Sequence, residues 1–219
     1  AQFYFLAVTS KYTIPGIQND GNYSGLAMEY MQNPRVVAFL QLGWKTTLNS
    51  TNIQNSYNSL NGKTDSEGIS LLDKGYFYPV DEPANQAKLD EIKAAATAIK
   101  AVYGDNYNLI APIHITGNIV KSNGGVDDFF SYVSDAVTAW CPKTFFFNTF
   151  GEVLGNSEAT QGTSIYAESQ FGLFKDRMEE EQAGGDEVWW YVTRKPHIPE
   201  ITVLTNQNAV NYRILFWQQ

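Results

Sequence analysis

Short apolar runs alternate with helical stretches along this chain, and the alternation restricts the fold more than any other feature. Strands are predicted at residues 2–8, 35–42, 76–80, 109–115, 136–141 and 187–193. The clearest helix is predicted over 85–103, where Leu89, Ile92 and Ile99 belong to one apolar stripe. Because strands are repeatedly followed by helices, we expect a parallel sheet with helices outside it.

Weaker patterns complete this prediction. Helices are expected at residues 24–31, 126–135, 165–181 and 206–217. The stretch 46–68 is rich in Asn, Ser, Thr and Gly, and it predicts a long loop, with or without one short helix. A (β/α)8 barrel of the TIM type needs eight strands and about 250 residues. We therefore expect residues 1–219 to form a single barrel domain that is incomplete at one or both ends.

Composition excludes several classes of partner. The chain has 15 Lys and Arg against 23 Asp and Glu residues, a formal net charge of -8, which argues against nucleic acid and anionic membranes. No apolar run approaches the length of about 18 residues that insertion into a membrane requires. Two histidines and the single Cys141 offer no metal-ligand spacing, so we expect neither a metal nor a cofactor.

Two neighbouring carboxylates, Asp81 and Glu82, follow the aromatic run that ends at residue 80. Pro83 suits the first turn of a helix, so the acids lie where a strand gives way to a helix. In α/β folds that end of the sheet binds ligands. Neighbouring carboxylates repel each other, which favours keeping one of them protonated, as a general acid must be. The alternative is that one of them only caps the helix.

Consecutive residues on a regular strand point to opposite faces of the sheet. Asp81 and Glu82 can therefore act on one substrate only if the chain twists or bulges between them. Pro83 favours such a distortion, because proline restricts the backbone of the residue before it.

Four segments carry a resemblance to a known family. They are Tyr-Phe-Tyr-Pro-Val-Asp-Glu-Pro at 76–83, Asp-Ala-Val-Thr-Ala-Trp-Cys-Pro at 135–142, Glu-Val-Trp-Trp-Tyr-Val-Thr at 187–193 and Asn-Tyr-Arg-Ile-Leu-Phe-Trp at 211–217. In this order they resemble the catalytic domain of glycoside hydrolase family 123, bacterial β-N-acetylgalactosaminidases with many uncharacterised relatives. The resemblance spans residues 76–217. It favours a secreted or cell-envelope location in a bacterium.

The resemblance also implies a fold and a mechanism. The family is a (β/α)8 barrel whose members act by substrate-assisted hydrolysis. Glu82 would be the acid/base, and Asp81 would orient the 2-acetamido group of the substrate. In the family a further strand follows the segment that matches 211–217, and this sequence stops before it, which implies an incomplete barrel and a fragment that can itself be inactive.

The residues themselves support a nucleophile supplied by the substrate. Retaining glycosidases with a protein nucleophile place two carboxylates about 5 Å apart. The expected strand ends at 113–116, 140–143 and 192–195 carry no acid. Glu152, in a loop well past the fifth expected strand, stays a possible second acid. An acetamido oxygen would then attack the anomeric carbon, while one acid protonates the leaving oxygen and the other stabilises the developing positive charge.

Five further residues are candidates for binding the sugar. Aromatic side chains stack on sugar rings, and imidazoles bond hydroxyl groups. The candidates are Trp140, His114, Trp44, Trp190 and Tyr191. Core packing is the alternative for each of them.

We therefore expect a hydrolase that removes β-linked N-acetylhexosamine, with N-acetylgalactosamine favoured, from an oligosaccharide or glycoconjugate. The alternatives are a glycosidase with a protein carboxylate as nucleophile, and a non-catalytic carbohydrate-binding barrel fragment.

Overall fold

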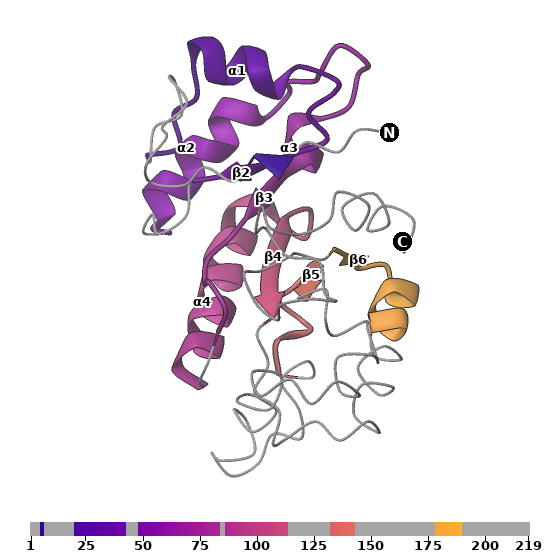
Figure 1. Ribbon diagram of the computed structural model, residues 1–219. Helices are drawn as coiled ribbons and strands as arrows, with labels where there is room; N and C mark the ends of the chain where they lie inside the picture. Colours follow the sequence, from indigo (N-terminus) through magenta and orange to yellow (C-terminus); the bar gives the residue numbers. More distant parts are fainter. Residues whose placement is uncertain are drawn as a thin grey trace, which may run out of the picture. The chain divides into compact units, whose positions relative to one another are not determined.

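The computed structural model describes residues 5–6, 20–42, 48–83, 86–113, 132–142 and 178–189 (Figure 1). The chain divides into two compact units. The first unit comprises Ala1–Asp81, Ala87–Ala111 and Phe130–Ala139, and the second comprises Glu82–Gln86, Pro112–Phe129 and Trp140–Gln219. Neither unit is a continuous stretch of chain, because the chain passes between them several times.

The described strands form one sheet whose order follows the sequence. They are β1 (Phe5–Leu6), β2 (Ala38–Gln41), β3 (Gly75–Phe77), β4 (Asn108–Ile113), β5 (Ala139–Pro142) and β6 (Glu187–Val188). The strand order is β1-β2-β3-β4-β5-β6. Parallel pairing joins β1 to β2, β2 to β3 and β3 to β4. The predicted α/β character with a parallel sheet is confirmed.

Four helices are described: α1 (Gly25–Met31), α2 (Ser50–Leu60), α3 (Leu71–Lys74) and α4 (Gln86–Tyr103). Side chains cap two of them, because Asn49 accepts from the Asn52 N–H and Ser70 accepts from the Leu72 N–H. Gly104 follows α4 in the left-handed conformation, with φ 67°. The stripe predicted for α4 is confirmed, since Leu89, Ile92 and Ile99 are fully buried.

Two details of the local structure differ from the prediction. The stretch 46–68 holds the one helix that the sequence allowed there, α2 (Ser50–Leu60), whereas α3 was not predicted at all. The Asn, Ser and Thr residues of α2 suggest a loop, but Ile53, Ser56 and Leu60 are buried on one side of it, and this packing overrides the weak helix propensity. The third strand ends at Phe77 and not at residue 80.

The remaining helix predictions lie wholly or mostly outside the described residues. The predicted helix at 206–217 lies wholly outside, and only the ends of those at 126–135 and 165–181 are described. Their described ends, at 132–133 and 178–181, are helical.

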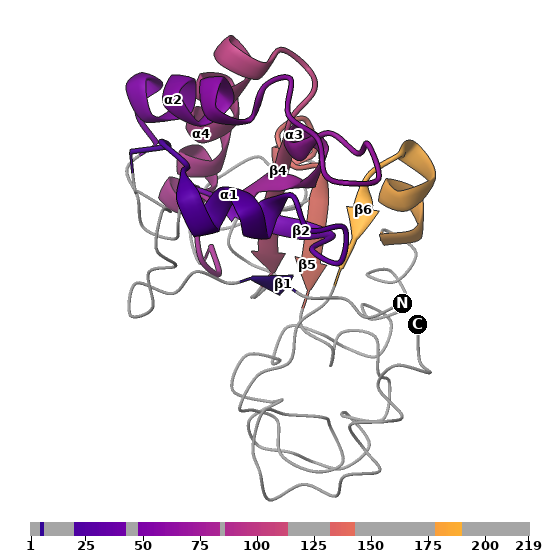
Figure 2. The ribbon, with the colours of Figure 1, turned by 90° about the horizontal axis from the view of Figure 1, so that it is seen from above.

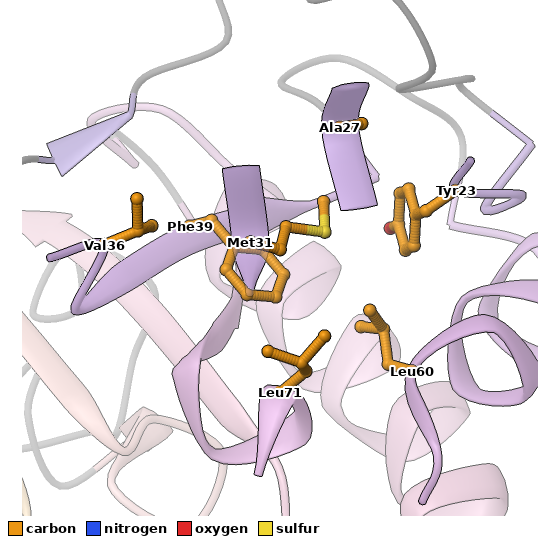
Figure 3. Close-up of a cluster of buried hydrophobic side chains, with 7 residues drawn as sticks. All are labelled: Tyr23, Ala27, Met31, Val36, Phe39, Leu60 and Leu71. Carbon is orange, nitrogen blue, oxygen red and sulfur yellow. The ribbon is translucent and has the colours of Figure 1, made fainter. Parts of the chain in front are cut away.

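An apolar cluster joins α1, α2 and α3 to β2. Figure 3 shows its members meeting in one place: Tyr23, Ala27, Met31, Val36, Phe39, Leu60 and Leu71. They come from α1, α2, α3 and β2 and from the chain beside α1 and β2, and Figure 2 shows these helices gathered next to β2. Burial of this apolar surface holds the helices against the sheet.

Both faces of β2 are buried. Phe39 belongs to the cluster with the helices, and Gln41, two residues further, contacts α2 and α4. Because side chains alternate along a strand, Ala38 and Leu40 lie on the opposite face, where they are also buried. Burial on both faces is typical of a parallel sheet inside an α/β fold.

Candidate functional site

The acidic pair lies at a bend in the chain beyond β3. The strand ends at Phe77, and the backbone bends at Asp81 and Glu82. Glu82 has φ 40°, in the left-handed region that residues other than glycine rarely adopt. The chain therefore leaves the regular strand geometry at the point where the sequence predicts a twist or bulge.

Asp81, in the first unit, is exposed and held by a neighbouring phenol. The Tyr78 hydroxyl donates a hydrogen bond to Asp81 Oδ1, with an O···O distance of 2.7 Å. Pro79 lies between them and restricts the backbone that joins them. A bond from a hydroxyl to a charged oxygen is stronger than one between neutral groups, so it favours one orientation of the carboxylate.

Glu82, the first residue of its segment in the second unit, is half-buried, and Pro83 after it is buried. Helix α4 begins at Gln86, so Asp81 and Glu82 both precede it. The alternative that one of the two acids caps this helix stays open. The direction of each side chain relative to a substrate stays a prediction.

Trp140 is fully buried in the second unit. Its indole Nε1 donates to Asp186 Oδ2 at 2.8 Å, and its carbonyl accepts from the Trp189 N–H at 2.7 Å. With no accessible ring face, Trp140 is better explained by core packing than by stacking on a sugar. Sequence reasoning missed Asp186 as its partner, since the two lie 46 residues apart.

The other predicted sugar-binding residues lie outside the described residues. They are Trp44, His114, Trp190 and Tyr191. Of the seven candidate site residues, the structure therefore describes Asp81, Glu82 and Trp140.

A buried polar network at the end of β2 was not predicted. Gln41 Oε1 accepts from the Ser56 hydroxyl at 2.8 Å and from the Tyr103 hydroxyl at 2.6 Å. The Tyr23 hydroxyl pairs with Ser56 Oγ and accepts from the Leu42 N–H at 3.0 Å. A glutamine inside the apolar run 35–42 was the signal that could have revealed the network.

The network is structural in character. Burial raises the pKa of Tyr23 to about 12 and also raises the pKa of Tyr103 well above its ordinary value, so both phenols stay neutral. Gly75 on β3 makes room for the glutamine, because a Cβ there would approach Gln41 Cδ to 2.8 Å. These groups connect β2 to α2 and α4 rather than to a substrate.

A buried ion pair holds the loop between α2 and α3. Lys74 Nζ lies 2.9 Å from Asp65 Oδ2 and also donates to the Asn33 carbonyl at 3.2 Å. The backbone N–H groups of Glu67 and Ile69 donate to Asp65 Oδ1. The hydrogen bond from Lys74, with these backbone bonds, holds the pKa of Asp65 below its ordinary value.

Cys141 offers no reactive thiol. It is buried, and burial raises its pKa to about 12, so it is protonated at neutral pH.

Among the described residues no group of three or more His, Cys, Asp or Glu side chains is placed to hold a metal ion. In the same part of the chain, each helix is too short or too polar to cross a membrane.

Comparison with known proteins assigns no family: no family model matches the chain, and no curated protein does. The resemblance to glycoside hydrolase family 123 therefore stays an expectation from the sequence.

Proposed function

We propose that this protein is a retaining glycosidase that removes β-linked N-acetylhexosamine, with N-acetylgalactosamine preferred. Glu82 is the acid/base and Asp81 orients the acetamido group. The observation that carries the proposal is the place of the acidic pair, at a bend beyond the carboxyl end of β3 in a parallel sheet. Ligands bind at that end of the strands in α/β folds.

We also propose that the sheet is part of a (β/α)8 barrel domain, incomplete over residues 1–219. The strand order follows the sequence without a reversal, whereas a doubly wound sheet reverses its order at a switch point. Right-handed crossovers in one direction place all helices on one face of the sheet. The other face then needs another cover, and a sheet that closes on itself provides one. Burial of Ala38, Leu40 and Tyr76 on that face fits this arrangement.

The chemistry follows from the two acids. The acetamido oxygen of the substrate attacks the anomeric carbon as the glycosidic bond breaks, and Glu82 gives its proton to the leaving oxygen. The product is a cyclic oxazolinium ion, whose ring nitrogen keeps its hydrogen and shares the positive charge. Asp81 accepts that N–H and stabilises the charge as it develops. Water then opens the ring, Glu82 takes the proton, and the configuration is retained.

The conformation of Glu82 supports the participation of both acids. On a regular strand their side chains would point to opposite faces of the sheet. Glu82 is in the left-handed region, which breaks this alternation. The strain of about 1–3 kcal/mol that such a conformation carries is common at functional sites.

Replacement of the acid tests the proposal directly. Glu82→Gln should lower kcat on β-N-acetylhexosaminides with poor leaving groups by about 10²–10⁴-fold, and much less on aryl glycosides that leave without protonation. Glu29→Gln, at an exposed position of α1, is the matched control and should change neither rate. Absence of hydrolysis by the full-length wild-type protein, or equal losses on both leaving groups, would refute the proposal.

A covalent adduct between a sugar and a carboxylate of this protein would instead establish the alternative with a protein nucleophile. Sugar binding without turnover, unchanged by Glu82→Gln, would establish the carbohydrate-binding alternative.

A further inference from the structure

The geometry points to Tyr78 as the residue that positions Asp81 for the acetamido group, an inference that rests on the proposed function. The Tyr78 hydroxyl donates to Asp81 Oδ1 at 2.7 Å. Neither the resemblance nor the residue pattern assigned a role to this tyrosine.

The hydrogen bond gives the two oxygens of the Asp81 carboxylate different roles. Tyr78 occupies Oδ1, and the acetamido N–H of the substrate is directed to Oδ2. A tyrosine three residues before the acid reaches it because the chain bends at Asp81, and Pro79 restricts the connecting backbone. The phenol carries no charge, so it orients the carboxylate without cancelling the charge that the reaction uses.

Orientation matters here because Asp81 is exposed. A carboxylate on the surface rotates among several rotamers, and only some of them aim an oxygen at the acetamido nitrogen. In the free protein, water competes for the phenol–carboxylate bond. A bound sugar excludes that water and strengthens the bond between Tyr78 and Asp81. The bond therefore has its largest effect while positive charge develops on the acetamido group.

A double-mutant cycle tests whether Tyr78 acts through Asp81. Tyr78→Phe removes only the hydroxyl and should lower kcat on an N-acetylhexosaminide about 10-fold, with KM changed less than about 3-fold. In an Asp81→Asn background the same change should alter kcat less than about 2-fold, because there is no carboxylate to orient. Tyr30→Phe on α1, another partly buried tyrosine, is the matched control and should behave as wild type.

A second measurement does not depend on turnover. A thiazoline mimic of the cyclic intermediate should bind Tyr78→Phe about 10-fold more weakly than wild type in calorimetry, a loss of about 1.4 kcal/mol. Circular dichroism and thermal melting should show that Tyr78→Phe folds as wild type does.

The outcomes separate the two ideas. In one outcome, hydrolysis depends on Glu82, but Tyr78→Phe lowers kcat as much in the Asp81→Asn background as in wild type. That outcome overturns the role of Tyr78 alone. An effect of Tyr78→Phe on KM without an effect on kcat, or unchanged thiazoline binding, also overturns it. A full-length wild-type protein that hydrolyses no N-acetylhexosaminide overturns the proposed function, and this inference with it.

Discussion

Two aspartates of the first unit, Asp65 and Asp81, have opposite surroundings. Asp65 is buried, and its oxygens accept from Lys74 and from two backbone N–H groups. Asp81 is exposed beyond β3, and Tyr78 donates to one of its oxygens. A carboxylate surrounded by protein donors serves the fold, because the surrounding groups already meet its hydrogen-bonding capacity. An exposed carboxylate that a phenol orients is suited to meet a ligand.

The largest expected effect is on catalytic activity, and it tests whether Asp81 differs in role from Asp65. Asp81→Asn keeps the shape of the side chain but removes the charge, so kcat on N-acetylhexosaminides should fall by about 10²–10³-fold, as for loss of one electrostatic stabiliser. The melting temperature should stay within about 2 °C of wild type, because surface substitutions rarely change stability. Steady-state kinetics and calorimetry measure the two quantities. Unchanged kcat with a lower melting temperature would make Asp81 a structural residue like Asp65.

Breaking the buried pair should affect stability instead. Lys74→Met leaves Asp65 charged and buried without its cation, and the melting temperature should fall by about 10 °C. Lys63→Met in the same loop is the control, since Lys63 is only partly buried, and its melting temperature should change little. A variant that melts as wild type does would show that the pair contributes nothing to the fold.

Gly75→Ala should cause a smaller loss. The added methyl group collides with the Gln41 side chain and disturbs the buried network, which should cost about 1–3 kcal/mol, as overpacking does. Urea denaturation measures this loss. Gly184→Ala is the control, because a Cβ there meets nothing within 4 Å. If Gly75→Ala is as stable as wild type, the glutamine moves without cost and the network is not tightly packed.

The smallest expected effect is a pH dependence. The pKa of Asp65 is lower in the folded protein than its ordinary value of 3.8, so its contribution to stability is complete above that value. It declines as pH falls from that value through the lowered pKa, because the unfolded chain takes up the proton before the folded protein does. Melting temperatures between pH 5 and pH 2.5 should fall less steeply for Asp65→Asn than for wild type. Parallel slopes would mean that other groups govern the acid sensitivity.

Local sequence patterns predicted much of the fold. The stripe of α4 and the apolar runs that became β2, β3 and β4 depend on residues a few positions apart, so their periodicity is visible in the sequence. The place of Asp81 and Glu82 beyond a strand was visible for the same reason. Helix α2 was left open between loop and short helix because its polar residues favour a loop locally, and burial of Ile53 and Leu60 within the first unit favours the helix.

Tertiary structure decided how the side chains are paired. Gln41 meets Tyr103 across 62 positions of chain, and Trp140 meets Asp186 across 46, so no local pattern predicts either bond. Trp140, which the sequence alone offered as a sugar-binding residue, is also fully buried in the fold. The sequence by itself determined that two acids follow β3. The folded backbone, with its bend and the left-handed Glu82, decided that Tyr78 reaches Asp81, because that contact depends on dihedral angles that residue types restrict but do not specify.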